Sequence, residues 1–147
     1  MLENIELPTT LFPEEAIPGL YAVAHEFYRN GKYEEGRIFF HFLTVANPFD
    51  SRFWMGLAAC YQMLKNHQAA SSAYAAAAVQ NSADPYAHFH AAECFFHMGD
   101  IPKALKALDS SLTVAKESEE YLHLIPRLEL LLNTWSNTLQ THGGCHD

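Results

Sequence analysis

Residues 88–97, HFHAAECFFH, bring three histidines, a glutamate and a cysteine into an otherwise apolar stretch. On a helix, His90, Glu93 and His97 fall on one face because they are three and then four residues apart. Imidazole and carboxylate groups in that arrangement could bind a metal ion or transfer protons to and from a substrate. Which chemistry applies depends on the elements that carry these residues.

Composition and charge exclude several classes of function. The chain has 147 residues, 49% of them hydrophobic, which is enough for one domain with a core. Its net charge of −8 argues against a nucleic-acid partner, because binding phosphates needs a basic surface. The apolar runs are too short for membrane insertion, and MLENIELPTT is not a secretory signal. Three widely spaced cysteines indicate a reducing compartment, so we expect a cytoplasmic protein.

The chain repeats at an interval of 34 residues. Gly31 and Gly99 end predicted helices, and Lys65 lies midway between them. The same interval relates matching side chains, namely Ala24, Ala58 and Ala92; Phe27, Tyr61 and Phe95; Gly36, Ala70 and Ala104; and Phe40, Tyr74 and Leu108. This is the period of the tetratricopeptide repeat, a pair of antiparallel helices that must stack on its neighbours to bury its apolar face. We therefore predict an all-α fold, an α-solenoid of three helix pairs.

The caps and prolines divide the chain into segments. Helices are expected at about 19–30, 33–46, 52–64, 67–80, 85–98 and 101–114, with Asp84 and Asp100 as N-caps and either Asp50 or Ser51 as a third. An apolar stripe predicts a seventh helix over about 117–140, which Pro126 kinks or begins. The expected organisation is an N-terminal arm (1–18), three repeats (19–114), a C-terminal capping helix (115–141) and a flexible tail (142–147).

Packing between repeats explains several residues of HFHAAECFFH without a catalytic or metal-binding role. Cys94 lies 34 residues after Cys60, where a small apolar residue suits the seam between helices. His90, Glu93 and His97 lack the further ligands that zinc needs, since the nearest candidate, His25, is two repeats away. The chain has no G-x-S-x-G, H-E-x-x-H or Gly-rich phosphate loop. We therefore predict no catalytic residue, no metal and no cofactor, and interpret these side chains as polar groups of a peptide-binding groove.

The first helix of each unit is expected to line that groove on the concave face. Its predicted lining is Tyr21, His25, Tyr28, Arg29, Arg52, Met55, Ala59, Gln62, Met63, Tyr86, Phe89, Glu93, Phe96 and His97. Aromatic and methionine side chains dominate this set, which suits an extended peptide with apolar side chains. Phe96 and Met63 are also candidates for the core.

Two stretches, DSRFWMGLAACYQ and HAAECFFHMGD, with GKYEEGRIFF in register, resemble the class II chaperones of bacterial type III secretion. The resemblance covers about residues 20–112. It implies a bacterial cytoplasmic chaperone that holds an extended apolar segment of pore-forming, hydrophobic translocator proteins and keeps them soluble and separate before export. It also implies that Tyr21, Tyr28, Tyr86 and Phe89 occupy aromatic groove positions, while His25 replaces a residue that is often aromatic.

Two alternatives stay open at this point. The chain could instead be a tetratricopeptide adaptor or scaffold for a folded partner or regulator. In the family that it resembles, the N-terminal arm often helps to form a homodimer, and the arm is shorter here than in many relatives, so the sequence leaves both a homodimer and a monomer open.

Overall fold

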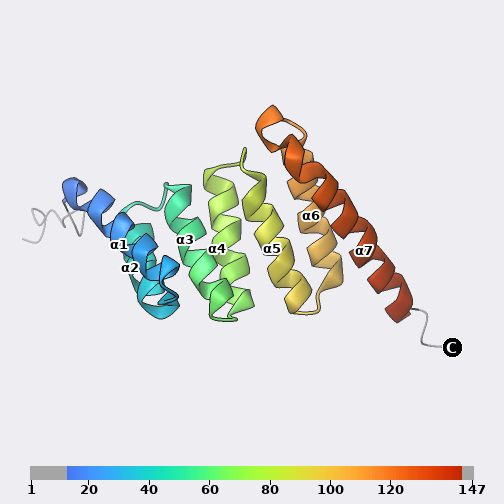
Figure 1. Cartoon of the computed structure of the whole chain (residues 1–147), viewed down its shortest axis with the longest axis horizontal. Coiled ribbons are helices and arrows are strands. Elements are labelled where there is room, and N and C mark those ends of the chain that lie inside the picture. The colour runs from blue at the N-terminus through green and yellow to red at the C-terminus, as the bar shows by residue number, and fades with distance from the viewer. Residues whose placement is uncertain (1–12, 144–147) are drawn as a thin grey trace, which may run out of the picture.

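The computed structural model describes residues 13–143, and over that range the chain is all-α. Three antiparallel helix pairs follow one another: α1 (Ile17–Arg29) with α2 (Tyr33–Ala46), α3 (Ser51–Met63) with α4 (His67–Gln80), and α5 (Pro85–His97) with α6 (Ile101–Ala115). A short 3-10 helix, η1 (Glu14–Ala16), precedes them, and a second, η2 (Glu119–Leu124), leads into α7 (Ile125–Gly143). Figure 1 shows the helices stacked in chain order from α1 to α7, which confirms the predicted solenoid. Residues 1–12 of the predicted arm (1–18) and residues 144–147 of the predicted tail (142–147) lie outside the described residues.

The 34-residue register places equivalent side chains at equivalent depths. The small residues of each first helix are completely buried: Ala24, Ala58 and Ala92. The large residues of each second helix fill the space between the paired helices: Phe40, Tyr74 and Leu108. Cys60 and Cys94 are free, buried thiols at the seam, as predicted, and burial raises the pKa of Cys60 to about 11 and that of Cys94 to about 12.

Each helix pair turns through the same backbone motif. The second residue after the first helix adopts a left-handed conformation, with φ of 75° at Gly31, 64° at Lys65 and 79° at Gly99. In the second unit, the Lys65 N–H donates to the carbonyl of Gln62, and the next amide, that of Asn66, donates to the carbonyl of Tyr61. This pair of bonds satisfies the last carbonyls of the helix. Lys65 therefore occupies a position that favours glycine.

Side-chain caps begin the later helices where the sequence predicted them. The carboxylates of Asp50, Asp84 and Asp100 accept hydrogen bonds from the backbone N–H groups of residues two or three positions further on. Asp50, and not Ser51, is the cap of α3. Pro126 lies at the second position of α7, so the predicted seventh helix starts at Ile125, and the segment before it forms η2.

Two buried clusters make up the core. The first extends from α1 to α5 around Phe40 and Phe53, and the second joins α5, α6, η2 and α7 around Leu108 and Leu128. The C-terminal helix α7 is therefore a structural part of the third unit's core. Within residues 13–143, no helix combines the length and the apolar character that crossing a bilayer requires.

Candidate functional site

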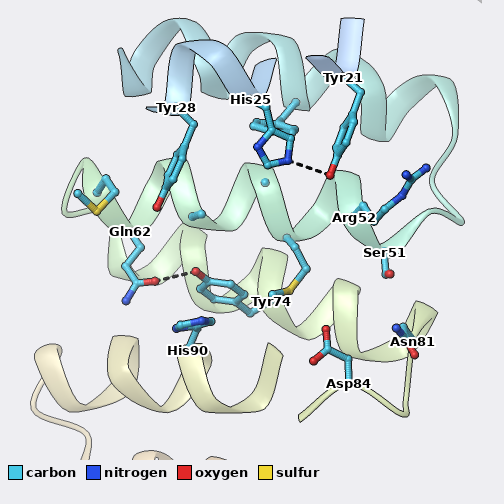
Figure 2. A pocket seen from close by; sticks show the side chains of 15 residues that line it. Tyr21, His25, Tyr28, Ser51, Arg52, Gln62, Tyr74, Asn81, Asp84 and His90 are labelled. Atoms are coloured by element: carbon cyan, nitrogen blue, oxygen red, sulfur yellow. Dashed lines mark hydrogen bonds between the residues drawn. The ribbon is translucent and has the colours of Figure 1, made fainter. Parts of the chain in front are cut away.

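A cavity of about 400 Å³ opens between α1 and α3 and extends to the start of the third helix pair. Figure 2 shows Tyr21, His25 and Tyr28 projecting from α1 toward side chains that come from α3, α4 and α5. The lining residues are Tyr21, His25, Tyr28, Phe40, Ser51, Arg52, Met55, Gly56, Ala59, Gln62, Met63, Tyr74, Asn81, Asp84 and His90. The wall is mainly apolar, and polar groups are confined to a small number of places.

The α1 side of the cavity is an aromatic wall that neighbouring side chains hold in place. The Tyr21 ring meets the Phe40 ring edge to face at 6.1 Å, and its hydroxyl is 2.9 Å from Nε2 of His25. The Arg52 guanidinium lies 5.0 Å from the centre of the Tyr21 ring, while its charge is paired with Asp50 at 2.7 Å. The one arginine of the lining is thus neutralised, and the cavity lacks the cationic clamp that would suit an acidic peptide.

Gly56 sets the depth of the cavity. A Cβ atom at this position would lie 2.2 Å from Cε1 of Phe40, so only glycine lets the Phe40 ring pass beneath α3. The ring then forms part of the cavity floor while remaining almost completely buried. The second helix of the first unit thereby contributes to a surface that the sequence assigned to first helices alone.

The floor between α3 and α5 is polar and internally hydrogen-bonded. The Tyr74 hydroxyl donates to Oε1 of Gln62 at 2.7 Å, and burial strongly raises the pKa of Tyr74, so its phenol stays protonated. Nδ1 of His90 is 2.6 Å from a carboxylate oxygen of Glu93. Burial is the largest influence on Glu93 and raises its pKa, but hydrogen bonds from His90 and Gln62, with the nearby charges, outweigh burial and lower it. Two polar side chains of HFHAAECFFH, His90 and Glu93, are thus hydrogen-bonded to each other.

The structure brings most of the predicted lining of the first two units together around this cavity. The predicted residues that line it are Tyr21, His25, Tyr28, Arg52, Met55, Ala59, Gln62 and Met63. Met63, which the sequence left between groove and core, is 45% exposed at the edge of the cavity.

The third unit contributes differently from the prediction, because α7 covers the inner face of α5. Phe89 is only 3% exposed and lies in the second core cluster beneath the Arg127 guanidinium, so its assignment to the groove was wrong. Phe96 stacks on Trp135 of α7, with ring centroids 4.4 Å apart. Tyr86 packs against the same cluster, with its hydroxyl 3.2 Å from Nε2 of His123. Phe89 and Phe96 thus pack against α7 and Tyr86 against η2, and none of the three lines the cavity.

Three further predicted residues also lie off the cavity. Arg29 is exposed and paired with Glu26. His97 stacks on His67 of α4, with ring centroids 4.9 Å apart. Glu93 is half-buried and reaches the floor through His90 and Gln62. His90 therefore contacts Glu93 while His97 packs elsewhere. Among the described side chains, no group of three His, Cys, Asp or Glu residues could hold a metal ion.

The prediction missed lining residues that come from second helices and turns. Phe40 and Tyr74 sit 34 residues apart on second helices, and the same repeat interval would have placed both at one depth. His90 was interpreted as a polar group of the groove but was left out of the predicted lining, and the structure places it in the cavity wall. Its equivalent in the second unit is Gly56. A glycine in one unit and an imidazole ring in the next indicate that the cavity floor differs between the two units, and the sequence contained this signal.

Comparison with known proteins places this architecture in context. A family model described as tetratricopeptide repeat matches residues 21–85 and 64–119. The low calcium response locus protein H of Yersinia pestis is 31% identical over 118 residues, which is 80% of this chain and 70% of that protein.

Solved structures of similar chains include complexes. PcrH of Pseudomonas aeruginosa with the chaperone binding region of PopD gives a TM-score of 0.83 at 27% identity, covering 88% of this chain and 97% of PcrH. The Yersinia enterocolitica type III secretion chaperone SycD with a peptide of the translocator YopD gives 0.81 at 30% identity, covering 86% and 96%. SycD has also been solved as an alternative dimer, and PcrH with the chaperone binding region of PopB.

Proposed function

Because this chain belongs to the tetratricopeptide-repeat family, and within it to the class II chaperones of bacterial type III secretion, we propose that it is a cytoplasmic chaperone for hydrophobic translocator proteins. An extended apolar segment of the client occupies the cavity between α1 and α3. The observation that carries the proposal is this open, largely apolar cavity on a chain whose relatives are solved with translocator segments.

Sequestering such a segment prevents both aggregation and insertion into the wrong membrane. A translocator exposes apolar surface that would otherwise associate with other chains or with the wrong membrane. A cavity whose walls are already ordered binds the segment without a large ordering cost of its own. The net charge of −8 helps to keep the complex in solution. This function needs no catalytic residue and no bound nucleotide.

The relatives' complexes favour a translocator client over a folded partner. PcrH is solved with the chaperone binding regions of PopB and PopD, and SycD with a peptide of the translocator YopD, so in each case the ligand is a segment of a larger protein. SycD dimers support a homodimer here as well, as a proposal that the measured mass of the purified chain would test.

Co-expression with candidate pore-forming proteins from the same gene neighbourhood tests the function directly. We expect the chain to co-purify with at least one of them and to keep it in the soluble fraction. Deleting the client's unstructured segment should abolish the complex. A complex that survives this deletion would favour the adaptor hypothesis instead.

Filling the cavity should separate binding from folding. Ala59 lines the cavity, and Ala59→Trp would occupy it. We expect more than a ten-fold loss of affinity for the co-purified client, measured by titration, with an unchanged circular dichroism spectrum. Ala75→Trp, at an exposed position of α4 that does not line this cavity, is the matched control. Met63→Glu provides a second test, because it places a charge at the exposed edge without adding bulk. Full affinity in both cavity variants would contradict the proposed binding site.

A further inference from the structure

An extended segment in this cavity brings unpaired main-chain groups with it. Each peptide unit has an N–H donor and a carbonyl acceptor, and burying either without a partner is costly. Helices build most of the cavity wall, and the backbone groups inside each helix are already bonded to one another; of the lining residues, Asn81 and Asp84 lie in the turn between α4 and α5. The helical part of the wall therefore cannot pair with the segment as a neighbouring β-strand would, and along it the partners have to come from side chains.

Two hydrogen-bonded side-chain pairs face the cavity from opposite sides. On the α1 side, Nε2 of His25 is 2.9 Å from the Tyr21 hydroxyl. On the other side, Gln62 accepts from the Tyr74 hydroxyl at 2.7 Å. Figure 2 shows both pairs, with apolar side chains between them. All four residues line the cavity.

Gln62 is fixed in an orientation that leaves donor capacity for a ligand. Its carboxamide oxygen is engaged by Tyr74, which is only 2% exposed and cannot move without disturbing the core. A carboxamide also has two N–H donors, and Glu93, itself held by His90, engages that side of the group. The second N–H is then available to a carbonyl in the cavity. A donor that its neighbours already hold in place loses little entropy on binding.

We propose that Gln62 and His25 form a hydrogen-bonding subsite for the main chain of the bound segment, which pairs with peptide groups lying between its apolar anchor side chains. This inference rests on the proposed function and adds to it the way in which the segment's backbone is held. His25 is the informative residue, because a cavity that binds through apolar contact alone would gain from an aromatic side chain at that position.

The test measures binding of fluorescein-labelled peptides to the full-length chain by fluorescence anisotropy. The probes are the chaperone binding regions of PopB and PopD and the YopD peptide, and the tightest binder of the three is carried forward. His25→Phe and Gln62→Leu should each weaken binding about five- to thirty-fold, because a buried peptide group loses its partner. His41→Phe and Gln68→Leu, at exposed positions outside the cavity, are the matched controls and should bind like the wild type.

Gln62→Leu also leaves the buried Tyr74 hydroxyl without its acceptor, so folding needs a separate control. The double variant Gln62→Leu/Tyr74→Phe removes both partners and should keep the helical signal, yet bind as weakly as Gln62→Leu. Tighter binding by His25→Phe, or wild-type affinity in the double variant, would overturn the inference while leaving the proposed function intact.

Backbone-modified peptides identify the bonded group. Replacing single amide bonds of the probe by esters removes one N–H donor and weakens one carbonyl acceptor at a time. We expect one or two positions to lose affinity in the wild type and to lose much less in the double variant, which shows coupling between that peptide group and Gln62. Uniform or absent effects along the peptide would overturn the inference. Failure of all three probes to bind the wild type would instead count against the proposed function, and the subsite would fall with it.

Discussion

Gly56 shows how a missing side chain can determine the shape of a binding surface. The Phe40 ring occupies the space that a Cβ atom would need, and the cavity floor depends on that ring. Gly56→Ala must therefore displace a side chain that is almost completely buried. We expect a loss of about 1–3 kcal/mol in the free energy of unfolding, measured by urea denaturation.

Gly19→Ala is the matched control within α1. Nothing lies within 4 Å of a Cβ built at Gly19, so alanine there should raise stability by about 0.5–1 kcal/mol through its better helix propensity. Equal effects of the two substitutions would show that the contact with Phe40 is not what requires glycine at position 56.

Two partly buried histidines make folding sensitive to mild acid. Burial lowers the pKa of His67, with further lowering by His97 and Lys65, and burial also lowers the pKa of His88 against an opposing effect of Asp84. Both imidazoles favour the neutral form in the folded chain, whereas the unfolded chain binds protons near its ordinary pKa of 6.5. Their contribution to stability is therefore complete above that pKa and is lost as the pH falls through the folded values.

We expect the urea midpoint to fall between pH 7 and pH 5, and to fall less in the double variant His67→Asn/His88→Asn. The comparison stops at pH 5 because Glu93 and the other carboxylates protonate at lower pH and would add their own effect. The same decrease in the variant and the wild type would exclude these two histidines as its source.

At the scale of single elements, the turn within each helix pair depends on one residue in a left-handed conformation. Gly31 and Gly99 adopt it without strain, but Lys65 in the second unit does not have that freedom. Lys65→Gly should therefore stabilise the chain by about 1 kcal/mol in urea denaturation. Gly31→Ala, the reverse change at the equivalent position, should destabilise it by a similar amount. A destabilising Lys65→Gly would mean that the lysine side chain has another structural role.

The helix pairs were predictable from the sequence because a 34-residue interval fixes which side chains face the seam. The depth of Phe40 and Tyr74, and the burial of Cys60 and Cys94, follow from it. The placement of α7 was not predictable in the same way. Its apolar stripe predicted that α7 packs against another part of the protein, but such a stripe does not identify the helix against which it packs.

The error at Phe89 has that origin. Phe89 is the repeat equivalent of Tyr21 and Met55, and both of these line the cavity. Tyr21 faces α3 of the next unit, with its ring centroid 5.6 Å from that of Phe53. For the third unit, the α-helix that follows is α7. Phe89 therefore packs against α7 instead of facing a ligand. Local periodicity identifies equivalent positions, but the end of a solenoid gives them different neighbours.

At the scale of the whole molecule, the contact between α5 and α7 should account for much of the stability of the C-terminal half. Trp135 is 8% exposed and stacks on Phe96. Trp135→Ala should lower the free energy of unfolding by about 3–5 kcal/mol, measured by circular dichroism in urea. Leu139→Ala, at a position 41% exposed on the same helix, should cost much less. Similar losses in the two variants would show that α7 is not held mainly through Trp135.

The limited size of the cavity between α1 and α3 has a consequence for a cell that exports more than one translocator. Two client segments that both require it cannot be accommodated on one copy of the chaperone at once, so they must compete for it. Their relative affinities and synthesis rates would then set how many chaperone molecules each client engages. Two clients bound to separate chaperone molecules would then meet each other only after secretion.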